Sequence, residues 1–288
     1  MGSYVPLTLS GFAHLCIAGS VLGAVCATPL DCVAQGKLDA RYTASLAGVP
    51  IGKGAWIIDI GDDQYTAAAS GMTAGILSVF TSGQGSGASR GHVHGDGFSP
   101  NTYASSITTD HKLEEMRIVL NSGMVKEVTI NPPTSFNPER VPLTDVHRRG
   151  VVDPMSAVLL GVPGNGNPLS PEACQRTIPV FDGRMRFDLQ MSYKRMDVVR
   201  AEKGYQGPAV VCAIQFVPLA GYVPSRPAVK YLVAQHDVEV WLAPIMGTRV
   251  VVPFRVSIPT PLGRGVVEAT QFITTPTPHR LTSNSPTH

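Results

Sequence analysis

The chain has 288 residues, and its 23 Lys and Arg together with 21 Asp and Glu make up only 15% of them. An average globular chain carries about 25% charged residues, so this sequence is neither a highly charged disordered protein nor a coiled coil. The net charge of +2 argues against a basic nucleic-acid binder, and no nucleic-acid partner is expected. The 29 Gly and 24 Pro interrupt helices too often for an all-α bundle, so the composition favours a mainly β protein.

The N-terminal segment is typical of an export signal. The first thirty residues contain no Asp, Glu, Lys or Arg, and residues 15–27 form a short apolar stretch. Small residues precede two candidate cleavage points, after Ala27 and after Ala34, and we favour the second because strand-like sequence begins at Leu38. We therefore expect residues 1–34 to be a cleaved signal peptide and the protein to be periplasmic. Because no positive side chain precedes the apolar stretch, an uncleaved anchor or a different start codon is the alternative.

The cysteines indicate the same compartment. Cleavage after Ala34 removes three of the five cysteines and leaves Cys174 and Cys212. An even pair in an exported protein favours a disulfide. The alternative is two buried free thiols that behave as small hydrophobic side chains.

Alternation of apolar and polar residues is the dominant pattern along the chain. Its longest regular run is Met185–Lys194, where every second residue is apolar, which predicts a strand with one apolar face. Less regular runs follow one another, separated by short breaks rich in Gly, Asn and Asp, and predict antiparallel hairpins. These runs are Leu38–Ala47, Ala55–Ile60, Tyr65–Ser70, Ile76–Ser82, Tyr103–Thr108, Glu115–Leu120, Val125–Ile130, Val210–Pro218, Val238–Ala243, Val250–Ser257 and Val266–Ile273.

Strands and helices do not alternate in this pattern, which argues against a nucleotide-binding α/β fold and an α/β barrel. We therefore predict a mainly β fold: a single long curved antiparallel sheet, or half-barrel, with one or two short helices. The antiparallel β domain is expected over residues 35–274. Residues 275–288 are rich in Pro, Ser and Thr and are expected to form a disordered tail.

One amphipathic helix is predicted after Asp153, which can cap a helix that begins at Pro154. Its apolar side chains recur at helical spacing, at Met155, Val158, Leu159 and Val162. Pro163 ends the pattern. A helix of this kind beside a long sheet can lie across the open face of the sheet as a lid.

A glycine-rich segment contains two motifs that suggest chemistry. Gly87–Gly91 matches the G-x-S-x-G pattern of a hydrolase around Ser89, but that pattern needs a strand before the serine and a helix after it. Glycines surround this serine instead, so we interpret the segment as a mobile loop. His92, His94 and Asp96 follow at a spacing that suits metal ligands, yet no second cluster completes a closed site. We interpret the histidines as exposed loop residues and expect neither a metal nor a cofactor.

Several segments carry a resemblance to known proteins. They are LDARY at Leu38–Tyr42 leading into LAGVPIG at Leu46–Gly52, RRG at Arg148–Gly150 leading to DPM at Asp153–Met155, EAC at Glu172–Cys174 before FDGR at Phe181–Arg184, and Cys212 before PLAGY at Pro218–Tyr222. In this order they resemble the bacterial domain of unknown function 3108 family, the later ones its alphaproteobacterial members. The resemblance implies an exported envelope protein in which Cys174 and Cys212 are bridged. That family has no established activity, so the resemblance implies no catalytic residues.

A long curved sheet with a helix across its mouth is also similar, at the level of fold, to the lipoprotein-carrier half-barrels of the bacterial envelope. This analogy implies that an apolar face shelters an acyl chain, with each buried methylene contributing about 0.8 kcal/mol. We therefore expect a lipid-like or otherwise apolar ligand to bind between the regular strand and the lid helix, at Phe187, Leu189, Met191, Met155, Val158 and Leu159. The alternative is that these side chains form a filled core.

Two functions follow from these observations. The first is a periplasmic binder or carrier of an apolar or lipid-like ligand. The second is an envelope scaffold or protein-interaction module with a filled core and an envelope protein as its partner. We do not expect an enzyme, because no nucleophile or acid–base pair occurs in a suitable context.

Overall fold

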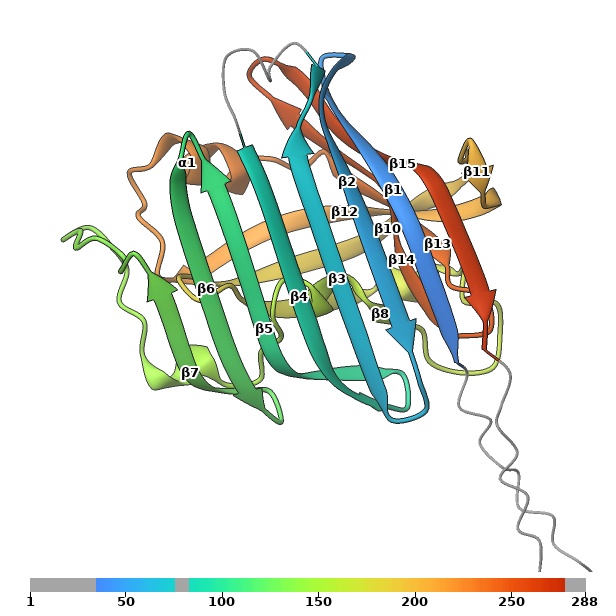
Figure 1. Cartoon of the computed structure of the whole chain (residues 1–288), viewed down its shortest axis with the longest axis horizontal. Helices are drawn as coiled ribbons and strands as arrows, with labels where there is room; N and C mark the ends of the chain where they lie inside the picture. Colours follow the sequence, from blue (N-terminus) through green and yellow to red (C-terminus); the bar gives the residue numbers. More distant parts are fainter. Residues whose placement is uncertain (1–34, 76–82, 278–288) are drawn as a thin grey trace, which may run out of the picture. The chain divides into compact units, whose positions relative to one another are not determined.

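The computed structural model describes residues 35–75 and 83–277 of the chain. Nearly all of the regular structure in these residues is β-strand (Figure 1). The first series of strands comprises β1 (Gly36–Leu46), β2 (Val49–Ile60), β3 (Gln64–Thr73), β4 (Gly83–His94), β5 (Gly97–Thr109), β6 (Lys112–Asn121) and β7 (Met124–Asn131). The second comprises β8 (Leu160–Gly161), β9 (Arg176–Phe181), β10 (Arg186–Arg200), β11 (Lys203–Gly204), β12 (Gln206–Ala220), β13 (Val238–Pro244), β14 (Val250–Thr260) and β15 (Gly263–Pro276).

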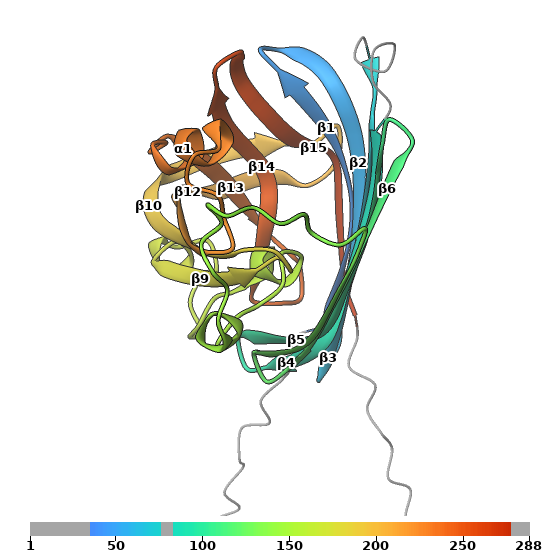
Figure 2. The same cartoon turned by 90° about the vertical axis from the view of Figure 1, so that its left-hand side faces the viewer.

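All of these strands belong to one sheet. Its main path is antiparallel, in the order β7-β6-β5-β4-β3-β2-β1-β15-β14-β13-β12-β10-β9, with β11 beside β15 and β8 beside β14. The first and last strands of the described residues, β1 and β15, therefore pair in the middle of the sheet. Figure 2 shows β1–β7 as one wall, with β9, β10 and β12–β14 turning to face it. The sheet is not closed by pairing between β7 and β9 in the described residues, so the predicted single long antiparallel sheet is confirmed.

A short segment links the two edges of the sheet. The Val151 N–H donates to Gly123 O at 3.0 Å beside β7, and the Val152 N–H donates to Pro179 O of β9 at 2.9 Å. We call residues 149–152 the strap. Since the next residue after the strap is Asp153, the strap determines where this carboxylate enters the space between the walls.

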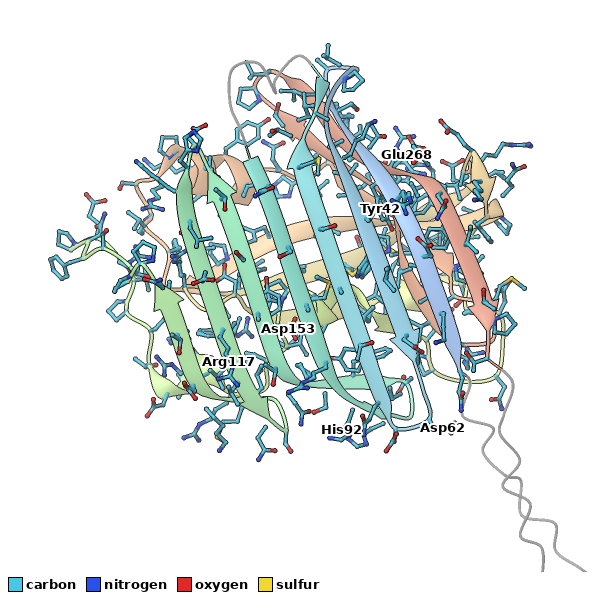
Figure 3. The ribbon with its side chains drawn as sticks, in the orientation of Figure 1. Tyr42, Asp62, His92, Arg117, Asp153 and Glu268 are labelled. Atoms are coloured by element: carbon cyan, nitrogen blue, oxygen red, sulfur yellow. A yellow bond between two sulfur atoms is a disulfide. The ribbon has the colours of Figure 1, made fainter. Side chains whose placement is uncertain are left out.

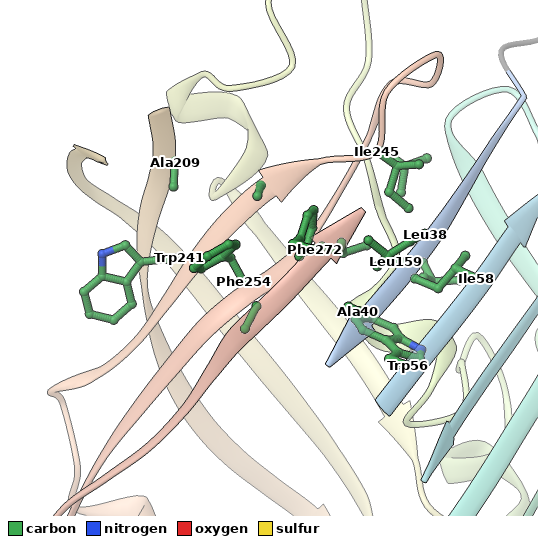
Figure 4. Close-up of a cluster of buried hydrophobic side chains, with 14 of the residues drawn as sticks. Leu38, Ala40, Trp56, Ile58, Leu159, Ala209, Trp241, Ile245, Phe254 and Phe272 are labelled. Atoms are coloured by element: carbon green, nitrogen blue, oxygen red, sulfur yellow. The ribbon is translucent and has the colours of Figure 1, made fainter. Parts of the chain in front are cut away.

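The apolar side chains that alternate along the strands gather in three buried clusters. The largest joins both halves of the sheet and includes Leu38, Ile58, Leu159, Phe254 and Phe272 (Figure 4). The second packs residues of β9, β10 and β12–β14 against the segment 157–174. The third surrounds Val151 of the strap. Burial of this apolar surface is the main force that holds the sheet in its curved form.

The prediction of an amphipathic helix after Asp153 is wrong. Asp153 does act as a cap, because its Oδ1 accepts two backbone N–H groups of the following turn. That turn is only a 3-10 helix, η3 (Ser156–Val158), and the backbone is extended again at Leu159. A helix of this length is marginal by itself, and Leu160–Gly161 instead pairs with β14. Strand pairing therefore outweighs the helical spacing of the apolar residues.

The prediction of a mobile glycine loop around Ser89 is also wrong. Residues Gly83–His94 form β4, which pairs with β3 on one side and with β5 on the other. At Gly91, where the β4–β5 register shifts, a Cβ would overlap the backbone of Ser99 and Pro100. The glycine thus permits close approach of two strands. His92 and His94 lie on this strand, with their rings stacked 5.9 Å apart.

Some elements were not predicted, one is longer than predicted, and some predicted segments lie outside the described residues. The helix α1 (Pro227–Val233), the 3-10 turns η2 (Asp145–Arg148) and η4 (Pro171–Ala173), and β9 are not predicted from the sequence pattern. β15 runs to Pro276, two residues into the expected tail. The expected signal peptide, the strand predicted over residues 76–82 and the tail from residue 278 lie outside the described residues.

Candidate functional site

A buried cluster of hydroxyl groups surrounds one carboxylate between the two walls (Figure 3 labels Asp153). Asp153 is fully buried, and its Oδ2 accepts hydrogen bonds from Ser89 Oγ at 2.9 Å and Ser156 Oγ at 2.5 Å. Since both serine protons are donated to the carboxylate, the Tyr65 hydroxyl donates to Ser156 Oγ, at 2.6 Å. We call these four residues the polar cluster. It joins β3 and β4 to η3.

Burial dominates the electrostatics of the polar cluster. It raises the pKa of the Asp153 carboxyl above its ordinary value, although the hydrogen bonds from Ser156, Ser89 and Met155 lower it. Burial also raises the pKa of Tyr65 to about 12. The ion pairs among the described residues do not include Asp153. This carboxylate is therefore held by neutral donors, which fix the position of η3.

An apolar groove of about 500 Å³ lies beside η3. It is formed by β1, β2 and β3 together with β14, β15 and the turn that carries Met155 and Val158. Tyr42 ties two of these strands together, because its hydroxyl donates to Pro253 O at 2.8 Å. We call this hollow the groove. Its main side-chain walls are Tyr42, Trp56, Met155, Val158, Val256 and Val267.

Three glycines make the groove hollow. Gly52, Gly54 and Gly71 line it, and Gly54 stands directly opposite Gly71 in the pairing of β2 with β3. Because side chains alternate along a strand, Gly52 and Gly54 share the face of Trp56. At Gly71 the nearest atom to an added Cβ is Lys53 O at 3.5 Å, an ordinary van der Waals distance. A side chain at position 71 would therefore fit the backbone and project into the groove.

A network of ion pairs around Glu239 links two strands of the sheet. Glu239 accepts hydrogen bonds from Arg195 at 3.1 and 3.0 Å and from Lys194 at 2.5 Å. These cations lower the pKa of Glu239 to about 2, with Arg195 the larger cause. The pairs tie β10 to β13 and have no contact with the polar cluster in the described hydrogen-bond network.

The six residues expected to bind a ligand lie in two places. Met155 and Val158 line the groove, and Leu159 is buried in the largest cluster beneath it. The strand row packs in the second cluster instead, where Met191 is buried and Phe187 and Leu189 are partly buried. The structure thus separates the predicted strand row from the residues predicted for the lid.

The groove contains residues that the sequence analysis does not single out. Tyr42 and Trp56 stand in runs predicted as strands, but their period shows only which residues share a face. A usable signal is the spacing of Gly52 and Gly54 two residues apart on the face of Trp56. Glycines at alternate positions remove side chains from one face of a strand and so indicate a hollow or a close approach there.

Cys174 and Cys212 form a disulfide with Cα atoms 5.4 Å apart, which confirms the predicted bridge. No group of three or more metal-ligating side chains occurs in residues 35–75 and 83–277. In the same residues no helix is long and apolar enough to span a membrane.

The chain is therefore a mainly β protein whose described strands form one open antiparallel sheet with an apolar groove. Residues 41–270 match the family model for proteins of unknown function DUF3108, and the chain belongs to this family. It is also similar to a solved structure, described as a β-barrel-like protein of domain of unknown function DUF1849 from Brucella abortus. The two are 10% identical with a TM-score of 0.43, and the match covers 84% of this chain and 98% of that one. No curated protein matches the chain.

Proposed function

We propose that this protein is a periplasmic binder or carrier of an apolar or lipid-like ligand, which it holds in the groove. The observation that carries the proposal is an apolar hollow of about 500 Å³ on a face whose other side chains form the core. Pockets for small molecules are commonly about 300 to 1,000 Å³ and mostly apolar. A ligand in the groove would make the apolar contacts that side chains at the three glycine positions would otherwise make.

The disulfide supports the proposed compartment. Disulfides persist in oxidising environments such as the bacterial periplasm, and Cys174 and Cys212 are both fully buried. The uncharged N-terminal stretch supports export by a cleaved signal peptide.

The second candidate is an envelope scaffold or protein-interaction module. It is favoured by Phe187, Leu189 and Met191, because this regular apolar row packs with a buried hydrophobic cluster rather than along the groove. The two functions therefore differ in one respect, namely whether the groove is occupied by a ligand.

The test compares two variants on β3. Gly71→Val places a β-branched side chain into the groove at a position with an open backbone environment. Ala68→Val is the matched control, because Ala68 is an exposed residue of the same strand and does not line the groove. Each protein is purified from the periplasm, and its lipid content is measured by extraction and mass spectrometry.

We expect the wild type and Ala68→Val to contain the same bound lipid, and Gly71→Val to contain about tenfold less, the change that 1.4 kcal/mol of lost affinity produces. Equal lipid content in all three proteins would show that binding does not use the groove. If none of them holds lipid, the scaffold function is supported instead.

A further inference from the structure

Two neighbouring hairpins end in exposed apolar turns at the same end of the sheet (Figure 1). Residues 47–50 of the β1–β2 hairpin and residues 261–263 of the β14–β15 hairpin are all exposed and carry no polar side chain. We call them the apolar rim. Leu262 is 76% exposed and Val49 45%. Because β1 pairs with β15, the two turns lie side by side, and the Ala47 N–H donates to Arg264 O at 3.0 Å.

Hydrogen bonds within the protein satisfy backbone groups of the apolar rim. The Leu262 N–H donates to Thr260 Oγ1 at 3.2 Å, and this hydroxyl donates to Gly263 O at 2.6 Å. Backbone polar groups without a partner are costly in lipid, so these internal bonds suit a turn that enters an apolar phase. A projecting turn also needs no matched surface in a bilayer, whereas the core of a protein interface requires close shape complementarity.

The charges nearest the apolar rim are all positive. Back along each of the four strands from its turn, the first charged residue is Arg41 on β1, Lys53 on β2, Arg255 on β14 and Arg264 on β15. Arg264 pairs with Asp237, and Arg255 lies 3.8 Å from Glu268. Arg41 and Lys53 are exposed and take no part in the ion pairs of the described residues. An anionic surface could therefore pair with them.

Arg41 and Lys53 also lie on one face of the sheet. Lys53 stands opposite Thr43 in the pairing of β1 with β2, and Thr43 shares the face of Arg41 because side chains alternate along a strand. Lys53 is about 13 Å from Val49 along an extended strand. Apolar segments at a membrane surface enter it by about 5 to 10 Å, so a long lysine side chain would reach the phosphate layer.

We propose that the apolar rim docks this protein onto the surface of a lipid bilayer. Leu262 and Val49 enter the boundary of the acyl chains, and Arg41 and Lys53 contact the headgroup phosphates. This docking goes beyond the proposed function and requires no ligand in the groove. Because the β1–β2 hairpin also lines the groove, a docked protein holds the groove near the bilayer.

The first experiment measures how the protein purified from the periplasm partitions onto vesicles of phosphatidylcholine, with and without phosphatidylglycerol. The wild type should bind both, and those with phosphatidylglycerol more tightly. Leu262→Asp should weaken binding to both about tenfold or more, because it places a carboxylate in an apolar layer. Lys53→Gln should weaken only the binding to phosphatidylglycerol, by about fivefold. Val146→Asp is the matched control and should bind as the wild type does, since Val146 is an exposed apolar residue of η2, outside the rim.

The second experiment does not depend on a loss of binding. Trp56 and Trp241 are both buried, so a change in fluorescence on binding of Leu262→Trp comes from position 262. Vesicles should shift the emission of Leu262→Trp to shorter wavelength, and brominated acyl chains should quench it. Val146→Trp should show neither effect.

Each contrary outcome overturns a stated part of the docking. A wild type that binds neither kind of vesicle, or a Leu262→Asp that binds as well as the wild type, overturns insertion of the apolar rim. Unchanged binding of Lys53→Gln to phosphatidylglycerol overturns the headgroup contact. If the wild type is a dimer that Leu262→Asp makes monomeric and no vesicle is bound, the rim contacts a second copy of this chain instead. These outcomes leave the lipid content of the purified protein unaffected, so the proposed function fails or stands separately.

Discussion

Asp153 caps a turn, as the sequence predicts, and is also fully buried without a cation, which the sequence does not reveal. The carboxylate accepts four hydrogen bonds, two from backbone N–H groups and two from serine hydroxyls. Removing it would leave these donors without their acceptor in an environment from which water is excluded. Its contribution to folding is therefore positional, because it fixes η3 beside the groove.

The pH dependence of stability should report this burial. The folded-state pKa of Asp153 is raised, while the unfolded carboxyl titrates near pH 3.9. Below that pH both states are protonated, and as the pH rises the unfolded state ionises first, so the free energy of unfolding falls until the folded carboxyl has also ionised. Asp153→Asn should lack this fall. Unfolding by urea at pH 4 and pH 7 measures it, and a wild-type–variant difference that does not change with pH contradicts the prediction.

At Gly91 the backbones of β4 and β5 approach each other so closely that a side chain does not fit. Gly91→Ala should lower the free energy of unfolding by about 2 to 4 kcal/mol, because its Cβ would overlap the backbone of β5. Gly85→Ala is the matched control on β4, where the nearest neighbour of an added Cβ is Ile107 Cγ1 at 3.5 Å, and should change the stability by about 1 kcal/mol or less. Equal effects of the two substitutions would contradict the close-approach explanation.

Among the elements, β12 and the turn η4 are linked covalently by Cys174 and Cys212, which lie 38 positions apart. Replacing both cysteines by alanine should lower the free energy of unfolding by about 2 to 4 kcal/mol. Reduction of the wild type should produce a similar loss, whereas the same reductant should leave the double variant unchanged. Labelling of both thiols in denatured, non-reduced periplasmic protein would show that the bridge is absent.

The sequence pattern predicts well those strands that bury one face and expose the other, because their apolar and polar residues alternate. The run Met185–Lys194 lies within β10 except for Met185, and the other runs of period two coincide with strands to within a residue wherever the structure describes them. The pattern fails at residues 153–162 and at β4 because pairing partners decide both. Leu160–Gly161 finds β14, and the glycines of β4 have strands on both sides.

At the scale of the whole molecule, export should produce a mature N-terminus at Gln35. Cleavage there would leave β1 complete, since β1 begins at Gly36 and the Thr277 N–H donates to Gln35 O at 3.1 Å beyond the end of β15. N-terminal sequencing of protein from the periplasmic fraction should therefore begin with Gln35. Intact Met1 in that fraction would contradict cleavage and support an uncleaved segment.

The sequence by itself determined the fold class, the cysteine pair and the capping role of Asp153, because each depends on composition or on residues close together in the chain. Only the tertiary structure decided where the groove lies. Gly54 and Gly71 become opposite one another through strand register, and Met155 reaches their wall because the polar cluster holds η3 there. A period of two shows which side chains share a face. It does not show which face of another strand they will meet, since that depends on pairing between segments far apart in the sequence.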